Sequence, residues 1–200
     1  MFVSFEKGLL FLANMKCASS SVSQSIRAYC EITPQSEKTI THRPMSSALD
    51  YLEARDYKTE GLTSFVTIRN PWARVYSFYK HVKAEPSKHP FWRDAARFET
   101  FEDFLLDSGV QEHLAELNFD HFCVDKKRGK RVDFCFRQET LLKDLKPFLA
   151  DRGIEIPGLP QARTNGRESD VSAYYDHKTS AIVGDIFASD VMAGMYEPPR

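Results

Sequence analysis

The sequence lacks a long apolar run and an excess of charge of either sign. Its first residues, MFVSFEKGLLFLANMKC, contain an apolar stretch of only about six residues, too short for a secretory signal or a membrane span. The 200 residues carry 27 Lys and Arg against 28 Asp and Glu, a formal net charge of -1. Because the charges nearly cancel, the protein as a whole has no strong positive potential that would attract nucleic acid or a membrane surface, so we expect neither as a partner. Any anion site must therefore come from local basic residues.

Metal-binding and disulfide patterns are also missing. The four cysteines, Cys17, Cys30, Cys123 and Cys135, form no Cys-x-x-Cys pair and have no zinc-site spacing. The last three lie in apolar or mixed surroundings, which favours free buried thiols and a reducing compartment. We therefore expect a cytoplasmic protein without a metal site. A dense basic run at 125–131, DKKRGKR, is interpreted as a solvated turn.

The chain shows no internal repeat and no low-complexity linker, so we expect a single domain over residues 1–200. Short apolar runs alternate with helical patterns, which indicates an α/β fold with a mainly parallel central sheet. The expected strands are 9–14, 64–69 and 132–137, the last also suited to an edge. The expected helices are 19–30, 70–84, 139–153 and 172–196, with a long surface loop at 153–171.

The segment KCASSS, residues 16–21, follows the first expected strand and opens the first expected helix. Ligands of parallel α/β sheets bind beyond the carboxyl ends of the strands. Free backbone N–H groups at a helix start favour an anion, and Lys16 adds a full positive charge. The alternative is that the serines only cap the helix. We favour anion binding because the lysine stands between the strand and the helix.

A second junction of the same kind supports this interpretation. Arg69 ends the next expected strand, Asn70 is a suitable N-cap, and Pro71 suits the first helical position. Arg74 and Ser77 are three residues apart and share a helix face. Guanidinium groups form bidentate hydrogen bonds with phosphate. The alternative is that Arg74 pairs with a carboxylate and Ser77 packs, but two anion motifs at one sheet edge favour a ligand with two separated phosphate-like groups.

The two motifs together, KCASSS and then VTIRNPWARVYSFY about fifty residues later, resemble the sulfotransferase family. The resemblance is greatest to its carbohydrate branch, which includes the heparan and chondroitin enzymes and small bacterial proteins. It continues in VDFCFRQETLLKDL and in the last expected helix, and so covers nearly the whole chain. It implies a three-layer P-loop-like fold, with a central, mainly parallel sheet flanked by helices, and an enzyme whose co-substrate is 3′-phosphoadenosine 5′-phosphosulfate (PAPS). It implies no metal.

The resemblance also implies site residues. Those expected to bind the 5′-phosphosulfate are Lys16, Cys17, Ala18, Ser19, Ser20 and Ser21. Those expected at the 3′-phosphate are Arg69 and Ser77, with Arg74 nearby. Arg163 and Arg167 lie where relatives fold a basic segment over the nucleotide; a solvated loop is an equal alternative.

A general base is needed to take the proton of the acceptor hydroxyl, and histidine suits this role near neutral pH. His42 lies between the two anion motifs, in a region that supplies the catalytic histidine in relatives, although Pro44 departs from their pattern. We therefore expect His42 and Lys16 to be catalytic. The branch implies a saccharide acceptor, but the segment 118–125, NFDHFCVD, lacks the branch's Pro-Gln motif.

Two other functions remain open. One is a P-loop-type nucleotide or small-molecule kinase. The lack of a G-x-x-x-x-G-K-[S/T] motif argues against this function. The other is a module that binds PAPS or its bisphosphate product without catalysis, an alternative that the departures at Pro44 and at 118–125 keep open.

Overall fold

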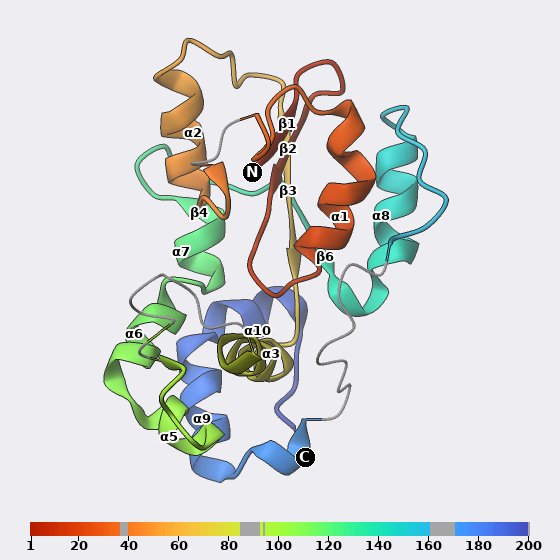
Figure 1. Cartoon of the computed structure of the whole chain (residues 1–200). Coiled ribbons are helices and arrows are strands. Elements are labelled where there is room, and N and C mark those ends of the chain that lie inside the picture. The colour runs from red at the N-terminus through yellow and green to blue at the C-terminus, as the bar shows by residue number, and fades with distance from the viewer. Residues whose placement is uncertain (37–39, 85–92, 94, 161–170, 200) are drawn as a thin grey trace. The chain divides into compact units, whose positions relative to one another are not determined.

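A computed structural model describes residues 1–36, 40–84, 93, 95–160 and 171–199 of the chain (Figure 1). The chain folds into two compact units. The sheet unit comprises residues Met1–Ile68 and Asp120–Ala162, and the helical unit comprises Arg69–Phe119 and Arg163–Arg200. The single domain expected from the sequence stays a prediction.

Among the described residues, the main sheet of the sheet unit has four strands in the order β1-β2-β3-β6. They are β1 (Phe2–Ser4), β2 (Leu9–Leu12), β3 (Thr63–Ile68) and β6 (Phe134–Arg137). β2, β3 and β6 are parallel, which confirms the mainly parallel sheet, and β6 is an edge strand. β1 was not expected from the sequence and pairs antiparallel with β2. Its three residues are too few for a periodic pattern.

Aromatic packing fixes one face of this sheet. Phe11 on β2 stacks on Phe65 on β3 with ring centroids 4.8 Å apart, and Phe65 contacts Phe148 at 5.3 Å. Phe148 comes from α8 (Leu141–Ala150), and Val22 and Ile26 of α1 (Ser19–Ile26) join the same buried cluster. Figure 1 shows α1 and α8 together on one side of the sheet and α2 (Met45–Glu53) on the other. Flanking helices on both faces confirm the mixed α/β class.

The basic run at 125–131 forms a turn between two short strands, β4 (Val124–Asp125) and β5 (Lys130–Arg131). Most of its cations are exposed, as expected, but Arg128 is only 14% exposed and pairs with carboxylates of α2. Its Nε donates to Glu53 Oε1 at 3.0 Å, and it also pairs with Asp50 and Asp125. Hydrogen bonds from Arg128 hold the pKa of Asp50 and of Glu53 below their ordinary values. The turn is therefore fixed against α2.

The helical unit contains α3, α5, α6, α9 and α10. Their bounds are α3 (Pro71–Ala84), α5 (Phe101–Leu106), α6 (Ser108–Ala115), α9 (His177–Ile186) and α10 (Ala188–Gly194), and α7 (Phe119–Cys123) joins the two units along the chain. Short 3-10 turns lie at Arg27–Tyr29, Gln138–Thr140 and Ser172–Tyr174.

The single helix expected over 172–196 is wrong, because the segment contains a 3-10 turn and two helices. Asp176 starts α9 with a capping box: its side chain accepts from the N–H of Thr179 at 2.7 Å. The hydroxyl group of Thr179 donates to the same carboxylate, and this bond, together with the backbone one, lowers the pKa of Asp176. At Phe187 (φ -107°, ψ 27°) the backbone leaves the helical region, and α10 begins at the next residue. A continuous apolar pattern cannot show such a local break.

The loop expected at 153–171 is only partly at the surface. Gly153, with φ +70°, ends the turn after α8, as expected of a C-terminal stop. Ile154 and Ile156 are then 1% and 3% exposed and belong to the aromatic cluster of the sheet unit. Ile154 and Ile156 thus pack inward on either side of an exposed residue, within a stretch whose composition is typical of a loop. Residues 161–170 lie outside the described part of the chain.

A buried ion pair links α3 to α10 in the helical unit. Arg74 is 2% exposed and Asp190 is fully buried, with Nη1 and Oδ1 3.3 Å apart. The other oxygen of Asp190 accepts from the N–H of Phe119 at 2.6 Å. The guanidinium also lies over the ring of Phe187, 5.4 Å from its centroid. The pair thus ties three segments of this unit together.

We predict that Asp190→Ala lowers the free energy of unfolding by about 3–5 kcal/mol, because it removes the carboxylate from a buried guanidinium. The double variant Arg74→Met/Asp190→Ala should lose less than the sum of the two single variants. Urea denaturation measures both. The control is Asp185→Ala, an exposed carboxylate on α9, which should change the value by less than about 0.5 kcal/mol. Additive losses would contradict the coupling.

Candidate active site

The segment 16–21 turns from the end of β2 into the start of α1. Lys16 has φ 61° and Ala18 has φ 60°, a left-handed conformation that costs residues with a side chain about 1–2 kcal/mol each. Ala18 is the N-cap of α1, and its carbonyl accepts from the N–H groups of Ser21 (3.0 Å) and Val22 (3.2 Å). The first N–H groups of α1, those of Ser19 and Ser20, have no acceptor within the helix by its geometry. The turn therefore presents donors at the carboxyl end of β2.

The alternative in which the serines cap the helix is contradicted. Ser19, Ser20 and Ser21 are the first three residues of α1, and Ala18 makes no side-chain cap. Ser20 is exposed, Ser21 is half-buried and Ser19 is 7% exposed. Cys17 is fully buried, and its Sγ lies 3.4 Å from the carbonyl oxygen of Met15. While Cys17 is buried, Lys16, Ser20 and Ser21 are at least partly exposed.

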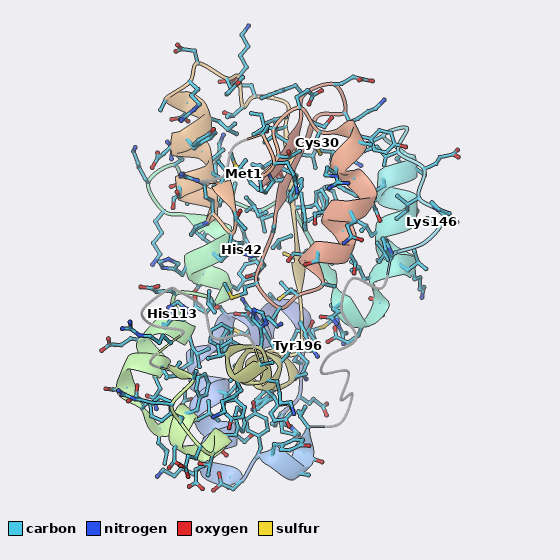
Figure 2. The ribbon with its side chains drawn as sticks, in the orientation of Figure 1. Met1, Cys30, His42, His113, Lys146 and Tyr196 are labelled. Atoms are coloured by element: carbon cyan, nitrogen blue, oxygen red, sulfur yellow. The ribbon has the colours of Figure 1, made fainter. Side chains whose placement is uncertain are left out.

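His42, labelled in Figure 2, is held beside this turn. Its Nδ1 lies 2.6 Å from the carbonyl oxygen of Ala13, the residue that follows β2. A carbonyl oxygen only accepts, so Nδ1 carries the hydrogen, and in the neutral ring Nε2 carries the lone pair. His42 also has a positive φ of 53°. Pro44, which departs from the family pattern, is the N-cap of α2.

The helical unit contains the second anion motif. Asn70 caps α3, since its Oδ1 accepts from the N–H of Ala73 at 3.1 Å, and Pro71 is the first helical residue, as expected. Arg69, directly before this cap, is half-buried. Ser77 is 5% exposed on α3. Arg74 is engaged with Asp190, as the alternative interpretation of the sequence had it.

The structure groups these residues as follows. Within the sheet unit it brings His42 to the strand that leads into the 16–21 turn. Within the helical unit Arg69 lies two residues before α3, and Arg74 and Ser77 lie on it. Arg163 and Arg167 lie outside the described residues. The carbonyl of Ala13 was missed from the sequence, because every residue has such an acceptor and no side-chain pattern marks it. Gln138, whose amide oxygen is buried without a partner among the described residues at the end of β6, was missed as well.

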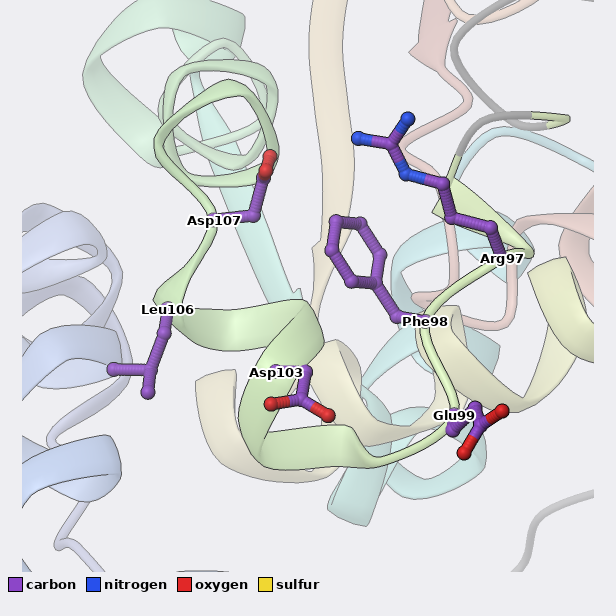
Figure 3. A pocket seen from close by; sticks show the side chains of 6 residues that line it. All are labelled: Arg97, Phe98, Glu99, Asp103, Leu106 and Asp107. Atoms are coloured by element: carbon purple, nitrogen blue, oxygen red, sulfur yellow. The ribbon is translucent and has the colours of Figure 1, made fainter.

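A hollow of about 500 Å³ lies in the helical unit between Arg97 and Asp107 (Figure 3). Its carboxylates include Asp103 and Asp107, and both have structural roles. The Oδ2 of Asp103 accepts from the hydroxyl of Thr100, and Asp107 accepts from the N–H of Val110, the latter as the cap of α6. This acidic hollow is not suited to an anionic co-substrate.

The described residues contain no group of three or more His, Cys, Asp or Glu side chains arranged to hold a metal ion. The four cysteines are free; Cys17 and Cys123 are buried, and Cys30 and Cys135 are half-buried. No helix among the described residues is long and apolar enough to cross a membrane.

Comparison with known families identifies the class. A sulfotransferase family model matches residues 1–191, nearly the whole chain. The chain therefore belongs to the sulfotransferase family, which supports sulfuryl transfer as its general activity and a hydroxyl-bearing acceptor. Comparisons with curated proteins and with solved structures gave no match.

The left-handed turn can be tested at Ala18. Ala18→Gly should keep or raise the free energy of unfolding, by up to about 1 kcal/mol, because glycine adopts φ 60° without a Cβ clash. Ala18→Val should lower it by about 1–2 kcal/mol, because a β-branched residue is an outlier there. Chemical denaturation measures both variants. A valine variant as stable as the wild type would contradict the left-handed conformation.

Proposed function

We propose that this protein transfers a sulfuryl group from PAPS to an acceptor hydroxyl. The observation that carries the proposal is the hydrogen bond between His42 Nδ1 and the carbonyl of Ala13. It fixes the tautomer that a general base needs and holds the imidazole at the strand that leads to Lys16. Family membership supplies the reaction class, because sulfotransferases generally use PAPS. A P-loop-like fold and one domain over 1–200 are part of the same proposal.

In the proposed reaction the acceptor oxygen attacks the sulfur of PAPS in line with the leaving group. A bond forms between this oxygen and sulfur, the bond from sulfur to the bridging phosphate oxygen breaks, and adenosine 3′,5′-bisphosphate leaves. His42 Nε2 receives the proton of the acceptor hydroxyl. Lys16 and the N–H groups at the start of α1 stabilise the charge that develops on the sulfuryl group and the leaving phosphate. This step uses no metal.

The co-substrate contacts are proposed by position. Lys16, Cys17, Ala18, Ser19, Ser20 and Ser21 bind the 5′-phosphosulfate, with Cys17 and Ala18 contributing through the backbone. Arg69 and Ser77 bind the 3′-phosphate. Arg74, buried against Asp190, fits a role in orienting α3 better than a direct phosphate contact. Arg163 and Arg167 stay predictions.

The acceptor is proposed to be a saccharide hydroxyl, in line with the resemblance to the carbohydrate branch. Aromatic residues around 98–105 do not support this directly, because Phe101 and Phe104 are 8% and 0% exposed and pack in the helical unit. A cytoplasmic location stays a prediction from the cysteine pattern.

Two titrations separate the proposal from a kinase. Adenosine 3′,5′-bisphosphate should bind without magnesium, and ATP with magnesium should bind far more weakly. The inverse result would favour the kinase. Transfer of ³⁵S from PAPS to a panel of saccharide and other hydroxyl acceptors then separates an enzyme from a module that only binds the nucleotide.

We predict that Arg69→Ala weakens binding of adenosine 3′,5′-bisphosphate by about 2 kcal/mol, about thirtyfold, through loss of a charge-assisted phosphate contact. Isothermal titration calorimetry measures the affinity. Arg27→Ala removes an exposed arginine of the sheet unit and should leave the affinity unchanged. Equal affinity of Arg69→Ala and wild type would remove Arg69 from the site.

We predict that His42→Ala lowers turnover by a factor of about 10²–10⁴ and leaves bisphosphate affinity within about threefold, because the imidazole acts on the acceptor proton. Sulfuryl-transfer assays measure turnover, and isothermal titration calorimetry measures the affinity. The control is His121→Ala, an exposed histidine. Unchanged turnover in His42→Ala would refute the assignment.

A further inference from the structure

Strand β3 carries two buried hydroxyl groups with different surroundings. Ser64, 3% exposed, donates from Oγ to Asp133 Oδ2 at 2.6 Å and accepts from the N–H of Asp133 at 3.0 Å. Thr67 is fully buried, and its Oγ1 has no hydrogen-bond partner among the described residues. Buried hydroxyl groups in proteins are nearly always paired, because leaving one unpaired costs free energy. The hydroxyl of Thr67 therefore calls for an explanation.

The strand geometry places Thr67 at the base of the 16–21 turn. Side chains two residues apart on a strand share a face, so Thr67 lies on the face of Phe65. That face carries α1, because Phe65 and Val22 belong to one buried cluster. Ala13 belongs to the same cluster, and Ala18 packs against it. Thr67 lies beyond Phe65 toward the carboxyl end of β3, where the start of α1 and its preceding turn also lie.

The pairing of β3 with β2 gives the same location. Leu12 pairs with Val66 in parallel register. One step further along both strands, Thr67 is level with Ala13, whose carbonyl accepts from His42. The backbone that follows Ala13 is the turn with left-handed Lys16 and Ala18. The carbonyl groups of this turn, which continues from Ala13, are therefore the candidate acceptors for the hydroxyl of Thr67.

We infer that Thr67 is a positioning residue whose hydroxyl group gains a hydrogen bond to a backbone carbonyl of residues 14–18 when the turn holds the anionic group of its ligand. This inference rests on the proposed function. Thr67 is fully buried, so its action on the ligand runs through the turn and not through direct contact. A small peptide rotation in a turn with two left-handed residues suffices to redirect a carbonyl. Part of the free energy of ligand binding then comes from the new hydrogen bond between the hydroxyl of Thr67 and this carbonyl.

This arrangement makes an unusual thermodynamic prediction. A hydroxyl paired in the free protein stabilises it, so its removal lowers stability. A hydroxyl that is paired only in the bound state costs free energy in the free protein. Its replacement by a methyl group of the same shape should therefore stabilise the free protein and weaken ligand binding. A purely structural threonine cannot produce these opposite effects.

The test uses Thr67→Val, Thr67→Ser and Ser64→Ala in the full chain. Thermal unfolding without ligand and calorimetric titration with adenosine 3′,5′-bisphosphate are the two measurements. Thr67→Val should unfold at the wild-type temperature or higher and bind the bisphosphate about tenfold more weakly, the effect of one lost hydrogen bond. Thr67→Ser keeps the hydroxyl and should bind within about threefold of wild type. Ser64→Ala should lose thermal stability and bind as wild type does.

Two results would overturn the inference alone: wild-type bisphosphate affinity in Thr67→Val, or a lower unfolding temperature of that variant without ligand. Either would mean that the hydroxyl is already paired in the free protein or plays no part in binding. A wild-type protein that does not bind the bisphosphate would overturn the proposed function and this inference together. The wild-type titration therefore separates the two failures.

Discussion

The parallel pairing of β2 with β3 is the constraint on which the sheet unit depends. It brings Phe11 onto Phe65, and this stack anchors α1 and α8 on one face. In the same register Leu12, the last residue of β2, pairs with Val66, so the turn after β2 and the last residues of β3 lie at one edge of the sheet. The candidate site thus follows from the packing: the core that buries the aromatic rings also fixes where the turn begins.

The sequence predicted the parts of this arrangement that have a period or a strong local signal. The three parallel strands, the start of α3 at Asn70 and Pro71, and the stop at Gly153 were predictable because apolar runs and capping residues act locally. β1 and the break at Phe187 were not, because a three-residue strand and a single non-helical residue leave no periodic trace. The burial of Ile154 and Ile156 was also missed, since it depends on packing against distant strands.

The sequence predicted which residues belong to the candidate site, but it did not predict which contacts their side chains make. Arg74 shows the difference: its position on α3 suits a phosphate, yet the packing of the helical unit gives it a buried carboxylate, Asp190. No sequence pattern near Arg74 predicts a partner that lies 116 residues away in the chain. For His42 the sequence supplied the residue, while its tautomer comes from a backbone carbonyl that no sequence pattern can mark.

Backbone conformation connects these observations. Of the five residues other than glycine with positive φ in the described chain, three are Lys16, Ala18 and His42. Each costs free energy that packing elsewhere must offset, and such residues cluster at functional sites. Ala18 adopts the left-handed conformation at a cost that glycine would not have, and it lies between two buried residues, Cys17 and Ser19. The left-handed residues therefore set most of this turn in the free protein, and the inferred pairing of Thr67 requires only that one carbonyl within it rotate.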